Sequence, residues 1–492
     1  MTSLTQLFRH FKSAALLSLF LCAAAQAKAA DAAQAKEADA TGDFAFTEQL
    51  RQSRLAWWRE AKFGLFIHWG AYAVPGHGEW YMSNHKVSIA DYAKYVAEFN
   101  PVKFDAAAWA RIAKDAGMKY VVLTAKHHEG FAMFDTKATD YTIVKATPFK
   151  RDVVRELADA CRSEGLKFGV YYSHGQDWRH PGGGNVRQWD PAQAGDADCY
   201  IDTIVIPQVH ELLNNYGPLD LFWWDSSVGL WTPNHSDRAA RLYEEFKAFP
   251  NLVINNRLYD SYRGRQFTPE YWQPVSPLER FIRGDYATPE GVIPGPRPEG
   301  LDWESCLTLN GMWGYKPEGE KIKPPAEVVL NLVDIVSKGG NLLLNVGPDP
   351  QGVIPPAHVE SLRTAGEWIR AHGEAIYGAG RTPFGGELGY YSAMLAGRDG
   401  ERGFVAAPEW RATTKPGKIF LHLFKWPDPD KHLKGRRYFR FPIPNTPIKS
   451  VYLFGDASRT PLKLTTKRDH IAIEMPDITP DPIATVLCVE LK

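Results

Sequence analysis

Two carboxylates are the residues of this sequence whose type and setting best suit catalysis. Asp225 ends the apolar run Leu219-Asp-Leu-Phe-Trp-Trp-Asp225, which is typical of a buried strand that presents an acid at its tip. Glu290 ends the polar stretch Gly284-Asp-Tyr-Ala-Thr-Pro-Glu290. On a scaffold rich in Trp and Tyr, such a pair indicates glycoside chemistry, in which one acid attacks the sugar and the other handles protons.

Short apolar runs over most of the chain alternate with longer amphipathic ones. The runs at 63–69, 120–125, 167–172, 219–225, 252–256 and 341–346 are predicted strands. Helical spacing followed by glycine predicts helices at 104–116, 152–163 and 327–337. This alternation predicts a parallel sheet buried on both faces. The number of units favours an α/β fold, a TIM-like (β/α)8 barrel over residues 45–380, with functional groups at the C-terminal ends of its strands.

The pattern changes near residue 381. Strand-like runs at 418–426, 450–454, 470–474 and 485–491 are separated by turns rich in Pro, Gly and Asp, and no helical pattern lies between them. Residues 381–492 are therefore expected to form a C-terminal β-sandwich domain.

The N-terminus has the features of a secretory signal. Arg9 and Lys12 precede an apolar stretch at 14–25 that is too short to span a membrane, and Ala25-Gln-Ala27 offers a cleavage site. We predict a signal peptide over residues 1–27 and a disordered lead-in, rich in Ala, Asp and Glu, over 28–44. The mature protein is expected in a periplasm or outside the cell, with no attachment to a membrane.

Charge and cysteine content bear on nucleic-acid binding, metal sites and disulfides. The 57 basic residues are balanced by 57 acidic ones, so net charge indicates no nucleic-acid partner. After cleavage four cysteines remain, and their spacing matches no metal or disulfide framework: Cys161, Cys199, Cys306 and Cys488.

Polar and aromatic residues gather where the first five predicted strands end. They are His68, His127 and His128, Tyr171 and Tyr172, Trp223 and Asp225, and Arg257. Packing would favour apolar side chains there, so the set indicates a site on one rim of the barrel. Each residue also has a structural alternative: His68 as a buried histidine bonded to a carbonyl, Asp225 as the cap of a turn, and Arg257 as an ion-pair partner.

The adjacent pair His127-His128 could form half of a metal site. Adjacent residues of a regular strand point to opposite faces, so at most one of them could reach a given ion. No H-x-H or H-E-x-x-H pattern accompanies the pair. We therefore expect neutral imidazoles that bind sugar hydroxyls, and no metal.

An ordered set of motifs resembles the α-L-fucosidases of glycoside hydrolase family 29. The motifs are Phe63-Gly-Leu-Phe-Ile-His-Trp-Gly70, Gly78-Glu-Trp-Tyr81, Ala125-Lys-His-His-Glu-Gly-Phe131, Gly169-Val-Tyr-Tyr-Ser173, Leu221-Phe-Trp-Trp-Asp225 and Gly340-Asn-Leu-Leu-Leu-Asn-Val-Gly-Pro348. The resemblance covers residues 45–375. It implies an exo-acting, retaining glycosidase that removes terminal α-L-fucose from fucosylated oligosaccharides or glycoconjugates and needs neither a metal nor an organic cofactor.

The resemblance also implies roles for individual residues. Asp225 matches the nucleophile. Glu290 is the preferred acid/base; Glu304, in Asp302-Trp-Glu-Ser-Cys306, is its rival, and Glu79 is a third candidate. The positions that match contacts to the sugar are His68, Trp80, His127, His128, Tyr171 or Tyr172, Trp223, Arg257 and Trp313. Ser226 stands where many relatives have Gly after the nucleophile.

Other functions remain open on the sequence alone. The same rim could belong to a fucose- or glycan-binding protein without catalysis, to a barrel glycosidase for another sugar such as an α-galactoside, or to a metal-dependent hydrolase. Two carboxylates favour an enzyme. The sequence leaves the fucosyl linkage and the oligomeric state undetermined.

Overall fold

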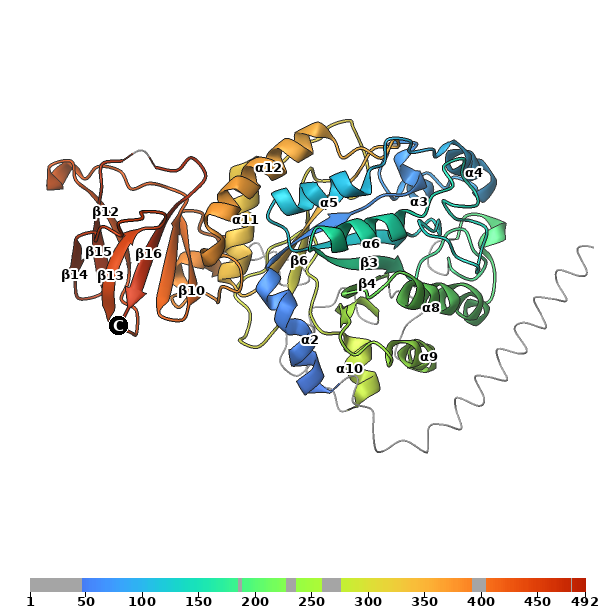
Figure 1. Ribbon diagram of the computed structural model, residues 1–492, viewed down its shortest axis with the longest axis horizontal. Helices are drawn as coiled ribbons and strands as arrows, with labels where there is room; N and C mark the ends of the chain where they lie inside the picture. The colour runs from blue at the N-terminus through green and yellow to red at the C-terminus, as the bar shows by residue number, and fades with distance from the viewer. Residues whose placement is uncertain (1–46, 185–187, 227–235, 259–275, 392–403, 479) are drawn as a thin grey trace, which may run out of the picture.

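The computed structural model describes residues 47–184, 188–226, 236–258, 276–391, 404–478 and 480–492. A barrel of strands and helices forms the larger part, and an antiparallel β domain lies at one end of it (Figure 1). The predicted signal peptide and lead-in lie outside the described residues. Within the described residues, no helix is both long and apolar enough to cross a membrane.

Seven parallel strands form the barrel sheet, in the order β5-β4-β3-β2-β1-β7-β6. Residues pair in register from strand to strand, as in Leu65 with Val121 and Val170 with Phe222. The prediction of a TIM-like barrel is confirmed. The strands are β1 (Phe63–Ile67), β2 (Tyr120–Lys126), β3 (Lys167–Ser173), β4 (Leu221–Asp225), β5 (Val253–Ile254), β6 (Glu304–Thr308) and β7 (Asn341–Val346).

An irregular segment at 285–291 takes the eighth position, between β5 and β6. Tyr286 bridges Asn255 on one side, and Glu290 bridges Cys306 on the other, both in parallel orientation. Backbone hydrogen bonds join the segment to both neighbours, including Asp285 N–H to Ile254 O at 2.7 Å. The segment makes isolated bridges and not a continuous ladder, so this position of the TIM-like barrel is filled without a regular strand. The segment carries Glu290 to the rim.

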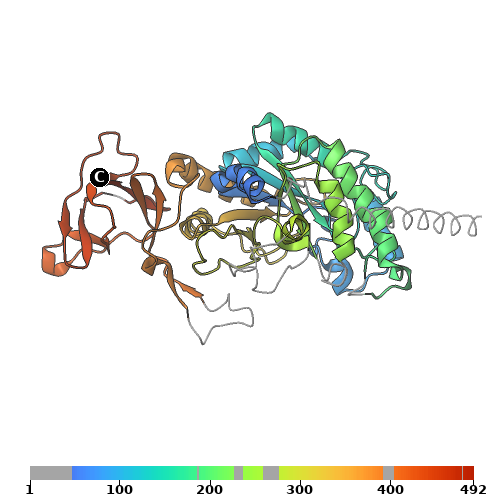
Figure 2. The same cartoon turned by 90° about the horizontal axis from the view of Figure 1, so that it is seen from below.

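Helices surround the sheet, and in Figure 2 they form an arc around the barrel strands. The three predicted helices are confirmed. Asp105 and Asp152 cap two of them by accepting N–H groups of the first turn. The helices are α2 (Glu48–Ala61), α3 (Tyr81–Asn84), α4 (Ile89–Glu98), α5 (Ala106–Asp115), α6 (Val153–Ser163), α7 (Ala197–Tyr200), α8 (Ile206–Asn215), α9 (Ser236–Phe246), α10 (Pro277–Arg283), α11 (Pro325–Ser337) and α12 (Pro356–Ala371).

The barrel strands have two apolar faces. Phe66, Tyr171 and Trp223 belong to a cluster inside the barrel. Leu65 and Tyr172 belong to the cluster between strands and helices. Side chains alternate between the two faces along each strand, so alternate residues of β1, β3 and β4 reach the interior.

The C-terminal domain has two antiparallel sheets that share one apolar core, which confirms the predicted sandwich. Phe439 and Ile473 from one sheet join Val451 and Leu487 from the other in this core. One sheet contains β10 (Trp410–Lys415), β11 (Lys418–Leu423), β16 (Thr485–Leu491) and β13 (Ile448–Leu453); the other contains β12 (Arg437–Pro442), β15 (His470–Met475) and β14 (Leu464–Thr466). A separate pair is β8 (Gly389–Tyr391) with β9 (Phe404–Ala406).

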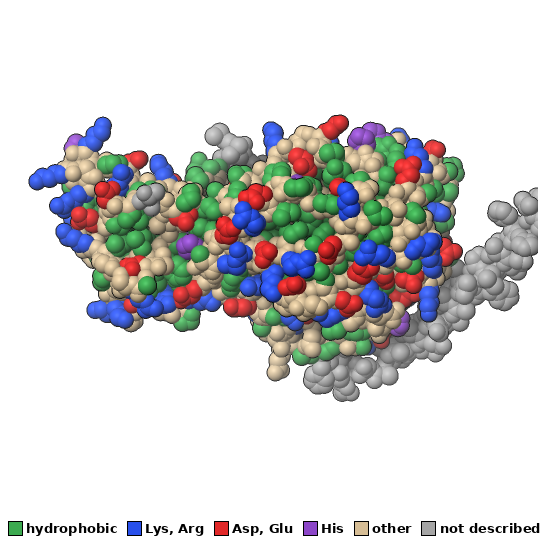
Figure 3. All heavy atoms as spheres, turned by 45° about the horizontal axis from the view of Figure 1, so that its top comes forward, with side chains coloured by type: hydrophobic (Ala, Val, Ile, Leu, Met, Phe, Trp, Pro, Cys, Tyr) green, Lys and Arg blue, Asp and Glu red, His purple; other side chains and the backbone are tan. Residues whose placement is uncertain are grey.

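A buried ion pair joins the two domains. Arg411 of β10 is 1% exposed, and its Nε lies 2.5 Å from Oδ1 of Asp334 in α11. Lys338 binds the other oxygen of Asp334 at 2.7 Å. On the outer face shown in Figure 3, acidic and basic side chains are interspersed, as equal numbers of the two charges allow.

Candidate active site

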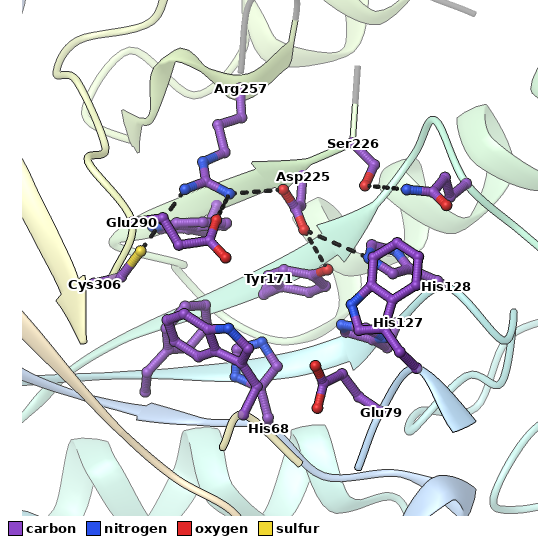
Figure 4. Close-up of a pocket in the computed structure, with 15 residues that line it drawn as sticks. His68, Glu79, His127, His128, Tyr171, Asp225, Ser226, Arg257, Glu290 and Cys306 are labelled. Atoms are coloured by element: carbon purple, nitrogen blue, oxygen red, sulfur yellow. Dashed lines mark hydrogen bonds and ion pairs between the residues drawn. The ribbon is translucent and has the colours of Figure 1, made fainter. Parts of the chain in front are cut away.

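A pocket of about 290 Å³ opens at the C-terminal ends of the barrel strands (Figure 4). This volume lies at the small end of the range for ligand pockets and suits a single sugar unit. Its lining is aromatic and polar: Phe66, His68, Glu79, Trp80, His127, His128, Tyr171, Gln176, Trp223, Asp225, Ser226, Arg257, Glu290, Cys306 and Trp313.

Arg257 joins the two predicted catalytic carboxylates. Its Nη1 lies 2.9 Å from Oδ1 of Asp225 and 2.8 Å from Oε2 of Glu290. These two oxygens are therefore no farther apart than the sum of the two distances, which fits the spacing of about 5–5.5 Å in retaining glycosidases. The Glu290 side chain is 29% exposed and that of Asp225 is 13% exposed, so Glu290 lies nearer the mouth.

The guanidinium of Arg257 is fixed by the segment that fills the eighth position. Nε donates to the Thr288 hydroxyl at 2.8 Å, and Nη2 donates to the Thr288 carbonyl at 3.1 Å. The guanidinium also lies over the Trp223 ring, 4.4 Å from its centroid. Arg257 is 1% exposed, so both carboxylates face a fixed positive charge in a dry setting.

Asp225 is held in its ionised form. The Tyr171 hydroxyl donates to Oδ2 at 2.7 Å, and His128 Nε2 lies 3.9 Å from the same oxygen. Burial by itself raises the pKa of Asp225, but attraction to Arg257 and His128 and the two hydrogen bonds outweigh burial, and the pKa falls below its usual value. A carboxylate at the end of β4 is thus available as a nucleophile.

His68 presents a hydrogen-bond acceptor to the pocket. Its Nδ1 lies 2.7 Å from Oδ1 of Asn345, whose amide group donates to the Trp313 carbonyl at 2.8 Å. The amide orientation makes Oδ1 the acceptor, so Nδ1 of His68 carries the proton. Burial lowers the pKa of His68 to about 3, so the ring is neutral and Nε2 has a free lone pair.

His127 and His128 both line the pocket. Both were predicted as sugar contacts. Since β2 ends at Lys126, the pair lies in the following loop, where strand alternation does not turn the two side chains apart. Their ring centroids are 4.0 Å apart. Ser173 donates its hydroxyl proton to the Gln176 carbonyl, so it accepts from Nδ1 of His128, 2.7 Å away. In its neutral form His128 therefore presents Nε2 as an acceptor.

Tyr171 is the tyrosine of β3 that faces the pocket. Tyr172, the other predicted contact, does not line the pocket: its hydroxyl donates to Gln208 Oε1 at 2.7 Å, among the residues between sheet and helices. The reason is strand alternation, which also turns Trp223 inward and Trp224 outward.

Glu304, the alternative acid/base, lies beneath the pocket and not in its lining. It is fully buried, accepts from the Tyr120 hydroxyl at 2.5 Å, and accepts from the indole of Trp223 at 3.2 Å. Burial raises its pKa to about 7. Because Glu304 is fully buried and absent from the pocket lining, the structure favours a structural place for it over contact with a sugar.

Aromatic side chains form much of the pocket wall. Trp313 lies 6.1 Å from Phe66 and 5.0 Å from His68 between ring centroids, and Trp80 packs on His128 at 5.0 Å. The Trp313 loop is anchored by Glu79, which accepts from Gly314 N–H at 2.8 Å. Apolar walls with a few polar groups suit a sugar that has an apolar edge.

Gln176, Ser226 and Cys306 line the pocket but were not predicted as contacts. Gln176 donates to the Ser226 hydroxyl at 2.9 Å. Ser226 has φ of 65°, a left-handed conformation that favours glycine, which explains why glycine suits this position. The Asp225-Ser-Ser motif was the available signal, and only the backbone angle makes it interpretable.

No group of three or more His, Cys, Asp or Glu side chains in the described part of the chain is arranged to hold a metal ion. The four described cysteines carry free thiols.

Comparison with known proteins identifies similar chains. The family model described as Alpha-L-fucosidase matches residues 30–374. The plasma alpha-L-fucosidase of Rattus norvegicus is 30% identical over 455 residues, which cover 86% of this chain and 88% of that protein.

Solved structures agree with this similarity. Alpha-L-fucosidase isoenzyme 1 from Paenibacillus thiaminolyticus has a TM-score of 0.71 at 35% identity, over 90% of this chain and 100% of that one. A GH29 alpha-L-fucosidase from Bacteroides thetaiotaomicron, trapped as a covalent intermediate with 2-fluoro-fucosyl fluoride, has a TM-score of 0.71 at 26% identity, over 89% and 96% of the two chains.

Proposed function

Because the chain belongs to the α-L-fucosidase family, we propose that its pocket binds one terminal α-L-fucosyl unit and hydrolyses the bond to it with retention of configuration. The observation that carries the proposal is the Arg257 bridge, which brings Asp225 and Glu290 together in one small pocket, close enough for a double displacement. The narrow pocket supports an exo-acting enzyme.

In the first step, an oxygen of Asp225 attacks the anomeric carbon. Glu290 gives its proton to the glycosidic oxygen, the bond to the aglycone breaks, and a fucosyl ester of Asp225 forms. In the second step, Glu290 takes a proton from water, the water oxygen attacks the anomeric carbon, and Asp225 leaves as a carboxylate. Two inversions give retention.

Arg257 serves both steps because the negative charge moves from one of its partners to the other. Before attack, Asp225 is charged and Glu290 is protonated; in the ester intermediate, Asp225 is neutral and Glu290 is charged. A guanidinium within 2.9 Å of both carboxylates stabilises each state without moving.

The remaining residues are suited to bind the sugar. The imidazoles of His68, His127 and His128 line the pocket, where hydroxyl groups would lie, and burial lowers the pKa of His68 and of His127, so these two rings are neutral. Phe66 and Trp313 offer an apolar wall for the methyl group of fucose. Natural substrates under this proposal are fucosylated oligosaccharides or glycoconjugates.

Release of free L-fucose tests the activity. The purified protein is incubated separately with an aryl α-L-fucoside, an α-1,2-fucosylated trisaccharide and a Lewis-type branched trisaccharide, and product configuration is followed by proton NMR. We expect α-L-fucose as the first product. Initial β-L-fucose would contradict double displacement, and release of galactose from an α-galactoside in place of fucose would contradict the sugar assignment.

Asp225→Gly tests the nucleophile. It should lose hydrolysis while remaining folded, and azide should then give the β-fucosyl azide by direct displacement. Unchanged hydrolysis would exclude Asp225. Asp220→Gly is the matched control, because Asp220 directly precedes the other end of β4, where it pairs with Lys167.

We also propose that the protein is exported to a periplasm or beyond the cell. The support is the basic, apolar and small-residue succession over residues 1–27. Fractionation of the native host, with N-terminal sequencing of the mature chain, tests the proposal; an N-terminus at Met1 in the cytoplasmic fraction would contradict it.

A further inference from the structure

Glu129 is a buried acid next to the pocket whose role the mechanism leaves unexplained. It follows His128 in the loop after β2 and is 1% exposed. Among the described residues, neither carboxyl oxygen has a hydrogen-bond partner in another residue, and Nδ1 of His127 also has none. Oε2 of Glu129 lies 3.7 Å from that nitrogen. Buried polar atoms without partners are rare and unfavourable, so two groups that face each other call for an explanation.

The surroundings of Glu129 favour its protonated form. The neighbouring ammonium of Lys126 is already bound to Asp177 at 2.9 Å and to the Tyr200 hydroxyl at 2.8 Å. Burial raises the pKa of Glu129 to about 8, and repulsion by Asp177 and Glu79 adds to the rise.

The other titratable groups near Glu129 are neutral phenols. They are Tyr72, Tyr92 and Tyr141, whose pKa values are all raised by burial and by this carboxyl group. Gly70 packs closely against the carboxyl group: a Cβ there would lie 2.8 Å from Oε1. A carboxyl group confined in this way, without a free cation, is a hydrogen-bond donor at neutral pH.

The two other imidazoles of the pocket have the opposite arrangement. Nδ1 of His68 donates to Asn345, and Nδ1 of His128 donates to Ser173. Both rings, when neutral, therefore present Nε2 to the pocket as an acceptor. His127 has no such acceptor at Nδ1, and the group that faces this nitrogen is an acid.

We propose that Glu129 is a positioning residue that donates its carboxyl proton to Nδ1 of His127, so that Nε2–H of His127 faces the sugar as a donor. A shift of less than about 1 Å brings the pair within hydrogen-bond distance. The pocket then offers an acceptor from His68 and a donor from His127. Each sugar hydroxyl can donate one hydrogen bond and accept others, so this mixed pair binds neighbouring hydroxyls better than two acceptors do.

This inference rests on the proposed binding of a sugar in the pocket, but its first test does not require activity. Protein labelled with 15N-histidine reports the tautomer of each ring by NMR, and comparison with His127→Asn assigns the His127 signals. At about pH 6.5 we expect the proton of His127 on Nε2 and that of His68 on Nδ1. A proton on Nδ1 of His127 would overturn the proposal, whether or not the protein hydrolyses fucosides.

Two variants of Glu129 distinguish a role in positioning His127 from a role in packing alone. Glu129→Gln keeps a donor for Nδ1, so it should keep the Nε2–H tautomer and the affinity for L-fucose. Glu129→Leu removes the donor, so it should weaken L-fucose binding by about tenfold, with a rise in KM larger than the fall in kcat. Equal affinity in both variants would contradict the proposal; if the Leu variant does not fold, the tautomer in the Gln variant decides.

A pH series gives a second readout. Above about pH 8 the ionised Glu129 should draw the His127 proton to Nδ1, so L-fucose binding should weaken in the wild type and stay level in Glu129→Gln. Glu387→Gln and Glu387→Leu are the matched controls, because Glu387 is also a buried acid with an unpartnered oxygen but lies outside the pocket. An equal effect of the Glu387 variants on L-fucose binding would show that loss of a buried acid acts through stability.

Discussion

Trp223 and Glu304 connect the floor of the pocket to the barrel interior: the indole N–H of Trp223 donates to Oε1 of Glu304 at 3.2 Å. Tyr120 binds the other carboxyl oxygen from the far side. Trp223 in turn lies under the Arg257 guanidinium. The Arg257 guanidinium, which contacts both proposed catalytic carboxylates, thus stacks on the Trp223 ring. The buried acid Glu304 in turn holds this ring in position.

Glu304→Gln should change how stability depends on pH. Burial raises the pKa of Glu304 to about 7, above its value in the unfolded chain, so the folded state holds the proton over the interval between the two. The stability of the wild type should therefore be full at low pH and fall as pH rises through about 7. Gln has no such proton, so thermal unfolding of the variant should decline less from about pH 5 to about pH 8.

The same variant separates Glu304 from the acid/base. Activity on an aryl fucoside should remain within about tenfold of the wild type. A much larger loss, together with rescue by azide, would transfer the acid/base role to Glu304.

Glu290→Ala should affect substrates according to their leaving group. Natural glycans need protonation of a poor leaving group, so their kcat/KM should fall by about 10²–10⁴. An aryl fucoside should be less affected in the first step, and azide should restore turnover with the α-fucosyl azide as product. Equal losses on both substrates, without azide rescue, would argue against Glu290 as the acid/base.

Arg257→Met should move the acid limb of the pH–kcat/KM profile to higher pH. Arg257 helps to keep the pKa of Asp225 below its usual value, so its removal leaves burial to raise that pKa. The lowered pKa also stabilises the fold above the unfolded-state pKa, and this contribution is lost as pH falls. Glu290→Gln is the control, because it keeps the contact between Arg257 and Asp225; its acid limb should stay in place.

Arg411→Met should loosen the contact between the barrel and the sandwich. Among the described residues, it leaves the buried Asp334 with Lys338 as its remaining ion-pair partner, and loss of one member of a buried pair costs about 3–5 kcal/mol when nothing replaces it. We expect a smaller but clear fall in unfolding free energy by urea titration. Arg363→Met removes exposed ion pairs on α12 and should change little; an equal effect of both would contradict a special role for the interface.

The regular strands of the barrel could be predicted because burial on both faces makes them continuous apolar runs. β6 was not predicted, since it begins with the polar residues Glu304 and Ser305; the partner of Glu304, Tyr120, comes from a distant part of the chain. Continuous apolar character also hid the choice between Tyr171 and Tyr172, because a strand buried on both faces lacks polar alternation.

The residues of the site were easier to predict from the sequence than the structure of the 285–291 segment, which carries Glu290. Polar residues at strand ends identified Asp225, His68 and Arg257, because the barrel brings such ends together. Glu290 was chosen by motif, and no local pattern shows that its segment bridges β5 and β6. Glu129 and Ser226 depend on burial and backbone angle, which no sequence period encodes.

The irregular closure of the barrel holds the two proposed catalytic acids in different ways. Asp225 ends a strand paired along its length with β3, whereas Glu290 lies in a segment joined to its neighbours by isolated bridges. Fewer backbone contacts therefore define the position of the proposed proton donor than that of the proposed nucleophile.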